Sequence, residues 1–335
     1  MFRENIINSL IIALLLGAAL TAYLMAEGYY VNLISRIIIF SIAGVGLNFA
    51  LGYGGMVSLG HAAFFGLGAY VAGIAAFHFG EESQFLFGLN GTNQMPMIWL
   101  ISILVSAFFA LIIGIISLRT TGVYFIMITL AFAQMIYYFA ISWPNYGGED
   151  GLLILARNQF SFNEINNGVN NGISIDTDNE LIFFLICFIL LIFILFISAR
   201  MLHSRFGNAL EVARMNDVRL ATAGINPFPI KLTAFVFSAM IVGLSGALFA
   251  DLNRFVSPSL MSWQMSGEII IFILLGGVGR LFGPVLGATL FVLLETFIGG
   301  YTEHWKLFLG LVLLAIVLFG KGGLMQLLAG DKHHV

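Results

Sequence analysis

Long apolar runs separated by short polar segments dominate the chain. Their lengths reach or approach the about 20 residues that an α-helix needs to cross a bilayer. They lie at about 6–25, 31–51, 57–78, 96–117, 122–142, 181–199, 230–250, 265–280, 284–299 and 306–320. The runs are continuous rather than alternating, so they predict helices and disfavour a β-barrel. We therefore expect an all-α integral membrane protein, a polytopic bundle of about ten helices in which residues 1–335 form a single domain.

Composition agrees with this expectation, because 60% of the residues are hydrophobic and only 9% are charged. Average soluble chains carry about 25% charged residues. The first run is longer than the core of a signal peptide and ends without a small-residue cleavage site, so we expect it to be retained as a span. The single Cys187 lies within an apolar run, which excludes a disulfide framework. Nothing in the sequence indicates a metal or a nucleic-acid partner.

Segment 200–231 is a basic polar interruption, about thirty residues long, between two apolar runs. Its basic residues are Arg200, Arg205, Arg214, Arg219 and Lys231. Its composition between Gly207 and Gly224 predicts one short helix outside the membrane, which Pro227 and Pro229 prevent from continuing. Two interpretations are open at this point. The helix could rest on anionic lipid headgroups, or it could dock another protein.

The distribution of Lys and Arg over the connections between the apolar runs predicts the orientation of the spans. If segment 200–231 is cytoplasmic, alternation of the spans places five further basic residues on the same side: Arg3, Arg119, Arg280, Lys321 and Lys332. Only Arg157, Arg254 and Lys306 then lie outside, with Arg36 near the outer end of a span. This bias predicts that both termini are cytoplasmic.

A dense glycine cluster, Gly52-Tyr53-Gly54-Gly55, interrupts the second and third apolar runs. It predicts an unwound backbone, which membranes tolerate only where it is buried in protein or lines a wet cavity. A helix that restarts at Met56 or Val57 would point free N–H groups at that cavity and could bind a carboxylate there, helped by Ser58 and His61. The alternative is that the small residues of this region only allow helices to pack closely.

A second glycine cluster, Gly276 to Pro284, has a similar pattern. Paired helix interruptions in two halves of a chain are typical of transporter repeats. The two stretches are too dissimilar to establish a repeat, but both are candidates for a substrate pathway.

Few ionisable residues lie within the apolar runs. Glu268 could bond neighbouring helices, bond an unwound backbone or face the ammonium group of a substrate. We expect Glu295 to reach the membrane interface and Arg36 to extend outward, with no partner assigned. A histidine such as His61 is more often a hydrogen-bonded packing residue than a ligand, and both interpretations stay open.

The outer connection at 143–180 is rich in asparagine and acidic residues. It predicts a solvated, mobile loop. The loop is either a tolerated insertion or a docking surface for a soluble partner, and it is too short for a second globular domain.

Several motifs in this chain resemble the permease family of ATP-binding-cassette (ABC) importers of branched-chain amino acids. The resemblance covers about residues 40–325. It is carried by Leu47-Asn48, Leu51 to Gly55, Ser58 to Gly66, Gly68-Ala69-Tyr70, Gly147 to Leu152, Gly207 to Leu210, Ala213-Arg214, Asn216-Asp217, Gly224-Ile225-Asn226, Lys231 to Val236, Leu274 to Gly277, Gly283 to Ala288 and Gly320 to Leu324.

The resemblance implies that segment 200–231 is the cytoplasmic coupling loop that docks into an ATPase. The coupling residues would be Gly207, Leu210, Arg214, Asn216, Asp217 and Gly224. The substrate pathway would include Gly54, Gly55, Ser58, His61, Glu268, Gly276 and Gly277. The implied partners are two ATPase subunits, a second homologous permease and a periplasmic binding protein, all at a bacterial inner membrane. Movement of the coupling helix would be transmitted through the flanking spans as rocking between bundles, giving alternating access.

The chain carries no ATP-binding motif of its own. Gly320-Lys321-Gly322-Gly323 lacks the Ser/Thr and the upstream glycine of a phosphate-binding loop, so ATP would bind a partner chain. An enzyme is disfavoured because no catalytic constellation is present. Two alternatives stay open: the same machine carrying urea or short amides, and an ion-coupled secondary transporter, which the scarcity of embedded ionisable residues disfavours.

Overall fold

The computed structural model describes residues 2–80, 84–85, 89–155, 157–161, 174–302, 304–319 and 322–329. Within this part of the chain, seven helices are long and apolar enough to span a membrane, and three shorter helices are also apolar. Apolar helices dominate because a chain in lipid must satisfy its backbone hydrogen bonds within each segment. The prediction of an all-α polytopic membrane protein is confirmed. Each of the ten predicted runs corresponds to one helix.

The chain divides into two compact units, which we describe separately. Unit 1 comprises Met1–Val57, Cys187–Ala234 and Gly267–Val335, and unit 2 comprises Ser58–Ile186 and Phe235–Ser266. Helices α6 (Glu180–Leu202), α9 (Pro227–Asn253) and α10 (Trp263–Gly276) contribute residues to both units. The division into units does not test the expectation of a single domain, which stays a prediction.

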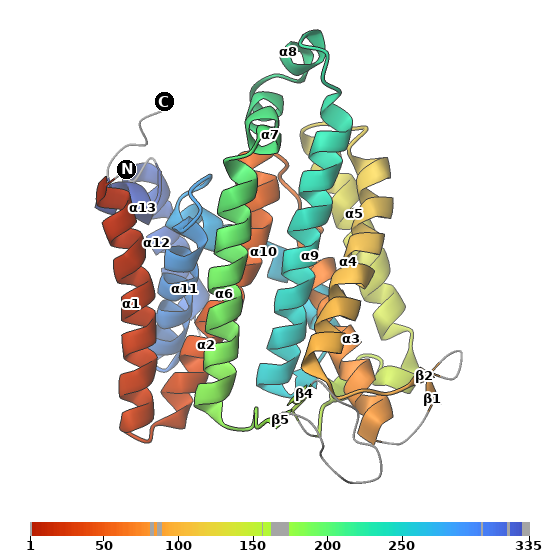
Figure 1. The fold of residues 1–335 in the computed structure, drawn as a ribbon, viewed down its shortest axis with the longest axis vertical. Helices are drawn as coiled ribbons and strands as arrows, with labels where there is room; N and C mark the ends of the chain where they lie inside the picture. Colours follow the sequence, from red (N-terminus) through yellow and green to blue (C-terminus); the bar gives the residue numbers. More distant parts are fainter. Residues whose placement is uncertain are drawn as a thin grey trace. The chain divides into compact units, whose positions relative to one another are not determined.

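Unit 1 has α2 at its centre, packed against α1 and most extensively against α11. Its other elements are α1 (Phe2–Leu24), α2 (Gly28–Asn48), the π-helix η1 (Phe49–Tyr53), α7 (Arg205–Met215), α8 (Asp217–Thr222), α11 (Gly283–Gly299), α12 (Trp305–Phe319) and α13 (Leu324–Ala329). The start of α1, α13 and α7 lie toward the same end of this unit (Figure 1). This matches the prediction that they share a side of the membrane. Which side is cytoplasmic stays a prediction.

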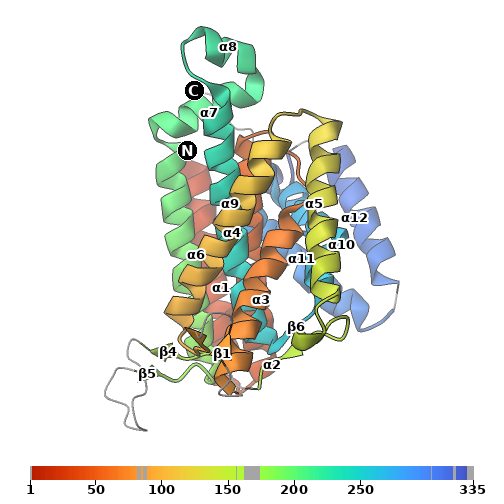
Figure 2. The same ribbon diagram turned by 90° about the vertical axis from the view of Figure 1, so that its right-hand side faces the viewer.

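Unit 2 is organised around α3, which packs on α4, α5 and the short helix η4. Its elements are α3 (His61–Gly80), β1 (Gln84–Phe85), β2 (Leu89–Asn90), α4 (Met95–Ser117), α5 (Val123–Ile141), η3 (Pro144–Tyr146), β3 (Leu152–Leu153), β4 (Phe160–Ser161), β5 (Ser174–Ile175), β6 (Phe255–Val256) and η4 (Pro258–Met261). The strands form three antiparallel pairs, β1 with β2, β3 with β6 and β4 with β5. Figure 2 shows α3, α4 and α5 from the side.

Close helix packing by small residues is present in unit 2, as one interpretation of the glycines predicted. A Cβ added at Gly68 in α3 would collide with the carbonyl oxygen of Gly243 in α9. The hydroxyl of Ser102 in α4 donates to the same carbonyl oxygen at 3.0 Å. Only a glycine at position 68 therefore lets these backbones come so close.

The connection at 143–180 is less solvated than its composition predicted. Arg157 and Asn158 are buried, and the Asn158 amide donates to a carboxylate oxygen of Asp251 near the end of α9 at 2.6 Å. The Arg157 guanidinium donates to the Asp251 carbonyl at 3.1 Å and to the Thr177 carbonyl at 2.8 Å. These bonds fasten the loop to unit 2, which corrects the expectation of a wholly solvated connection. Its asparagines at 163, 166, 167, 170 and 171 lie outside the described residues.

Candidate functional site

The first helix interruption lies between α2 and α3. After α2 the chain makes one π-helical turn, η1, and then runs without helix from Gly54 to Gly60. Gly55 has a φ of +68°, a conformation that L-residues other than glycine rarely adopt. Gly52 and Tyr53 are still helical, and the next helix begins at His61. The predictions that unwinding starts at Gly52 and that the helix restarts at Met56 or Val57 are therefore wrong by a few residues.

The second interruption, predicted at Gly276 to Pro284, is confirmed. Helix α10 ends at Gly276, and α11 begins at Gly283. Gly277 and Gly279 between them have φ values of +120° and +75°. Both interruptions therefore depend on glycines in left-handed backbone conformations.

Asn48, at the end of α2, connects these two regions within unit 1. Its amide nitrogen donates to the Arg280 carbonyl at 2.9 Å, and its amide oxygen accepts from the Gly279 N–H at 3.0 Å. Asn48 is fully buried, so it satisfies backbone groups that the interruption at 277–282 leaves without helical partners. Sequence reasoning did not assign Asn48 a role. The available signal was an amide between apolar neighbours, Leu47 and Phe49, at the end of the second apolar run.

Arg280, whose role the sequence left open, is only 6% exposed. Its guanidinium donates to the carbonyl oxygen of Met325 in α13 at 3.0 Å. This bond ties the second interruption to α13.

Helix α7 contacts the first interruption directly. The Arg214 guanidinium donates to the carbonyl oxygen of Gly52 in η1. A Cβ added at Gly55 would lie 3.0 Å from Cγ of Arg214. Leu210 and Gly207 on the same helix are buried, so they pack inward rather than facing solvent.

The polar segment forms two helices instead of the single one predicted. Asn216 has an extended backbone, with φ −163° and ψ 112°, which ends α7. Its side-chain oxygen then accepts from the N–H groups of Val218 and Arg219, capping α8. The side chains of Asp217 and Lys231 form an ion pair at 2.6 Å. Gly224 has a φ of +82° in the turn before α9.

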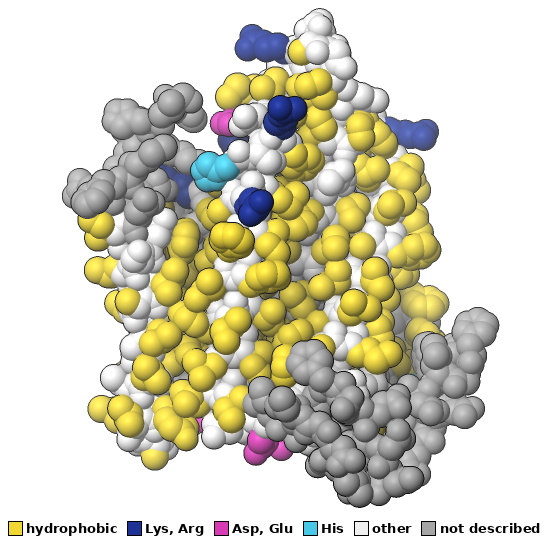
Figure 3. Space-filling model, in the orientation of Figure 1, with side chains coloured by type: hydrophobic (Ala, Val, Ile, Leu, Met, Phe, Trp, Pro, Cys, Tyr) yellow, Lys and Arg dark blue, Asp and Glu magenta, His cyan; other side chains and the backbone are white. Residues whose placement is uncertain are grey.

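The outward side of α7 and α8 carries exposed apolar residues. Val212, Met215 and Val218 are 36%, 67% and 70% exposed. Figure 3 shows hydrophobic side chains along α6 and Lys and Arg side chains toward α7 and α8. The segment therefore presents a mixed apolar and basic surface.

Ser58 and His61 are fully buried within unit 2. A ring nitrogen of His61, Nε2, lies 2.9 Å from the Ser238 hydroxyl, and the rings of Phe64 and Phe235 pack edge-on against the imidazole. The Ala62 N–H at the start of α3 donates to the Ser266 hydroxyl at 2.8 Å. In this conformation the Ala62 N–H and one ring nitrogen of His61 are engaged by the protein itself, whereas Nδ1 of His61 is buried without a hydrogen-bond partner.

Glu295 and Arg36 form an ion pair at 2.9 Å between α11 and α2. Their side chains are 24% and 32% exposed. The sequence assigned neither residue a partner, and the structure shows that each neutralises the charge of the other. That Glu295 reaches the membrane interface and that Arg36 extends outward stay predictions. Glu268 is half-buried and lies within electrostatic reach of Arg36, Glu295 and Lys306.

The seven predicted pathway residues divide between the units. Unit 1 contains Gly54, Gly55, Glu268, Gly276 and Gly277, and unit 2 contains Ser58 and His61. Their role in a substrate pathway stays a prediction. Among the described residues, no three His, Cys, Asp or Glu side chains are placed to hold a metal ion.

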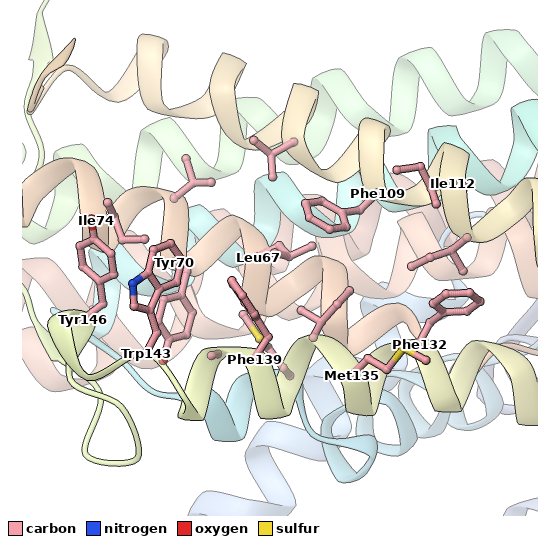
Figure 4. Close-up of a pocket in the computed structure, with 16 residues that line it drawn as sticks. Leu67, Tyr70, Ile74, Phe109, Ile112, Phe132, Met135, Phe139, Trp143 and Tyr146 are labelled. Atoms are coloured by element: carbon pink, nitrogen blue, oxygen red, sulfur yellow. The ribbon is translucent and has the colours of Figure 1, made fainter. Parts of the chain in front are cut away.

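A cavity of about 730 Å³ lies between α3, α4 and α5 in unit 2 (Figure 4). Its lining is aliphatic and aromatic, including Leu67, Val105, Phe109, Phe132 and Met135. No lining residue carries a charge. A zwitterionic amino acid would lose hydration in such a cavity without gaining partners, so the cavity does not suit one.

Comparison with known proteins agrees with the resemblance seen in the motifs. A family model described as "Branched-chain amino acid transport system / permease component" matches residues 29–317. The chain is 27% identical over 329 residues to the high-affinity branched-chain amino acid transport system permease protein LivM of Salmonella typhimurium, covering 95% of this chain and 74% of that protein. The LivM protein of Escherichia coli gives the same identity and coverage. No solved structure matches.

The matched region contains both helix interruptions, the α7–α8 segment and nine of the ten apolar helices almost in full. A match over most of the chain, joined to this membrane architecture, shows the family. The chain is a multi-pass membrane protein that belongs to the family of branched-chain amino acid transport permeases.

Proposed function

We propose that this chain is the permease subunit of an ABC importer for branched-chain or other hydrophobic amino acids. Two separate ATPase subunits bind and hydrolyse ATP, and this chain needs no cofactor of its own. A second homologous permease completes the pathway, and a periplasmic binding protein delivers the substrate. The complex sits in a bacterial inner membrane with both termini of this chain in the cytoplasm.

The hydrogen bond from Arg214 to the Gly52 carbonyl carries this proposal. Helix α7 is anchored in unit 1 by buried Leu210 and Ala213, so it moves with the elements beneath it. A push on α7 is therefore passed to the backbone at Gly52 and Gly55. Asn48 extends the connection to the second interruption. Left-handed glycines at both interruptions can absorb such a displacement.

The surface of α7 and α8 favours a protein partner over a lipid surface. The apolar residues Leu210, Ala213 and Leu220 already pack within the chain. The exposed residues Val212, Met215 and Val218 are therefore available to contact a partner outside this chain. In the proposed complex, an ATPase subunit covers them.

Glutamates at Met215 and Val218 test this contact. We expect Met215→Glu with Val218→Glu to abolish co-purification of the ATPase while the chain still inserts into the membrane. Ile225→Glu is the matched control, because Ile225 is 43% exposed on the same segment but outside both helices. Undiminished ATPase binding by the double variant would contradict this docking surface.

Transport is tested with the complete complex in proteoliposomes. Labelled leucine should accumulate only with ATP and the binding protein, and excess urea should not compete. Competition by urea would instead favour the urea or amide alternative. Uptake driven by an ion gradient without ATP would exclude the ABC mechanism.

A further inference from the structure

The cavity between α3, α4 and α5 has no part in the proposed mechanism, yet it has the properties of a binding site. Its volume of about 730 Å³ lies within the ~300–1,000 Å³ typical of small-molecule sites. Because its lining lacks charge, its ligand must be largely hydrocarbon where it contacts α4 and α5.

The cavity is continuous with the outer surface of its helices. Ile112, Met135 and Phe139 line it and are themselves 40%, 61% and 64% exposed. In a membrane such apolar exposed residues face lipid, so bilayer chains meet the opening directly. The lining residues on α5 run from Phe132 to Ala140, about 12 Å at 1.5 Å per residue. That length is close to the ~15 Å thickness of one leaflet's hydrocarbon.

One end of the cavity is different in chemistry. Tyr70, Trp143 and Tyr146 gather there, away from Phe109 and Phe132 (Figure 4). Trp and Tyr are enriched where hydrocarbon meets lipid headgroups. The Tyr146 hydroxyl lies 2.9 Å from Nε2 of His78. Tyr70 is only 7% exposed, and its buried hydroxyl has no hydrogen-bond partner.

A buried hydroxyl without a partner is costly, so a ligand that accepts its hydrogen bond would be favoured. The ester carbonyl of a glycerophospholipid is such an acceptor, and it stands where the acyl chain joins the headgroup. We propose that this cavity binds one acyl chain of a bilayer phospholipid, with the chain between α3, α4 and α5 and an ester carbonyl at Tyr70.

The test uses the purified complex in nanodiscs made with phosphatidylcholine that carries a photoreactive diazirine near the end of one acyl chain. After illumination, mass spectrometry locates the adducts. In the natural sequence we expect saturable adducts concentrated on the cavity end near Phe109, Phe132 and Met135. Adducts spread evenly over all exposed apolar helix faces would overturn the proposal. So would cross-linking of these residues to another polypeptide, because a partner helix would then fill the cavity.

Two pairs of variants sharpen the result. Val105→Trp fills the cavity and should reduce these adducts at least fivefold, whereas Leu104→Trp, on an exposed neighbour outside the lining, should not. Tyr70→Phe removes only the hydroxyl and should lower phospholipid retention during detergent washing a few-fold. Tyr138→Phe, on a 63% exposed residue of α5 outside the lining, is its control.

The identity of the retained lipid shows whether the hydrocarbon chain in the cavity belongs to a phospholipid or to a free fatty acid. Organic extraction followed by mass spectrometry should recover phospholipid near one molecule per chain from the natural sequence. Recovery of free fatty acid alone, or equal retention by Tyr70→Phe and the natural sequence, would refute the assignment of the ester to Tyr70 and with it the proposed ligand.

Discussion

The guanidinium of Arg214 in α7 donates a hydrogen bond to the carbonyl oxygen of Gly52 in η1, across 162 positions of sequence. This bond connects the polar segment outside the apolar helices to the point where α2 gives way to non-helical backbone. A π-helical turn such as η1 is itself a common feature of functional sites.

Arg214→Ala should uncouple α7 from the first interruption without preventing assembly. A hydrogen bond from a charged group contributes about 1.5–3 kcal/mol, which corresponds to roughly a tenfold or greater effect. We expect leucine uptake to fall by that order while the ATPase still co-purifies. Arg219→Ala is the control, because Arg219 is exposed on α8. Full uptake by Arg214→Ala would show that the bond plays no part in transport.

Gly55→Ala should destabilise the protein more than Gly224→Ala. Both glycines have a positive φ, +68° and +82°, so an alanine strains the backbone at each position. At Gly55 the added Cβ would also press on Cγ of Arg214, 3.0 Å away, whereas nothing lies within 4 Å at Gly224. The difference between the two melting temperatures in detergent measures that contact. Equal melting temperatures would mean that the Arg214 side chain moves away from the added Cβ without a cost in stability.

Arg36→Met alone should destabilise the protein more than Arg36→Met combined with Glu295→Met. The single variant leaves the Glu295 carboxylate in apolar surroundings without its partner. An unpaired charge at the bilayer centre costs about 2.5–3.5 kcal/mol, and less near a helix end, where Glu295 lies. Melting temperatures of the two variants, measured by thermal unfolding, check this order of stability. A double variant less stable than the single one would indicate that the Glu295 carboxylate has a favourable partner other than Arg36.

Ser238→Ala should destabilise unit 2 by about 1–3 kcal/mol, because it leaves Nε2 of the buried His61 without a partner. Ser245→Ala on the same helix is the matched control. Its hydroxyl bonds only the Val242 carbonyl of its own helix, so its loss should cost little. Equal stability of the two variants would argue that another group replaces Ser238 at His61.

The sequence by itself determined the membrane character, the ten apolar helices and the existence of two glycine interruptions. These features follow from local properties, since apolar length and glycine content act through neighbouring residues and the bilayer. The motifs likewise identified the family without any structure. The exact ends of the first interruption were missed because capping by Ser266 and the π-helical turn depend on residues elsewhere.

Only the tertiary structure decided which polar groups meet. Arg36 and Glu295 are 259 positions apart, and Asn48 and Arg280 are 232 apart. The pairing of Arg214 with Gly52 and the cavity beside Tyr70 depend in the same way on how the helices pack. A single sequence shows that a buried charge needs a partner, but it does not show which residue that partner is. Many helix packings satisfy the same hydrophobic pattern, and only one of them brings given side chains into contact.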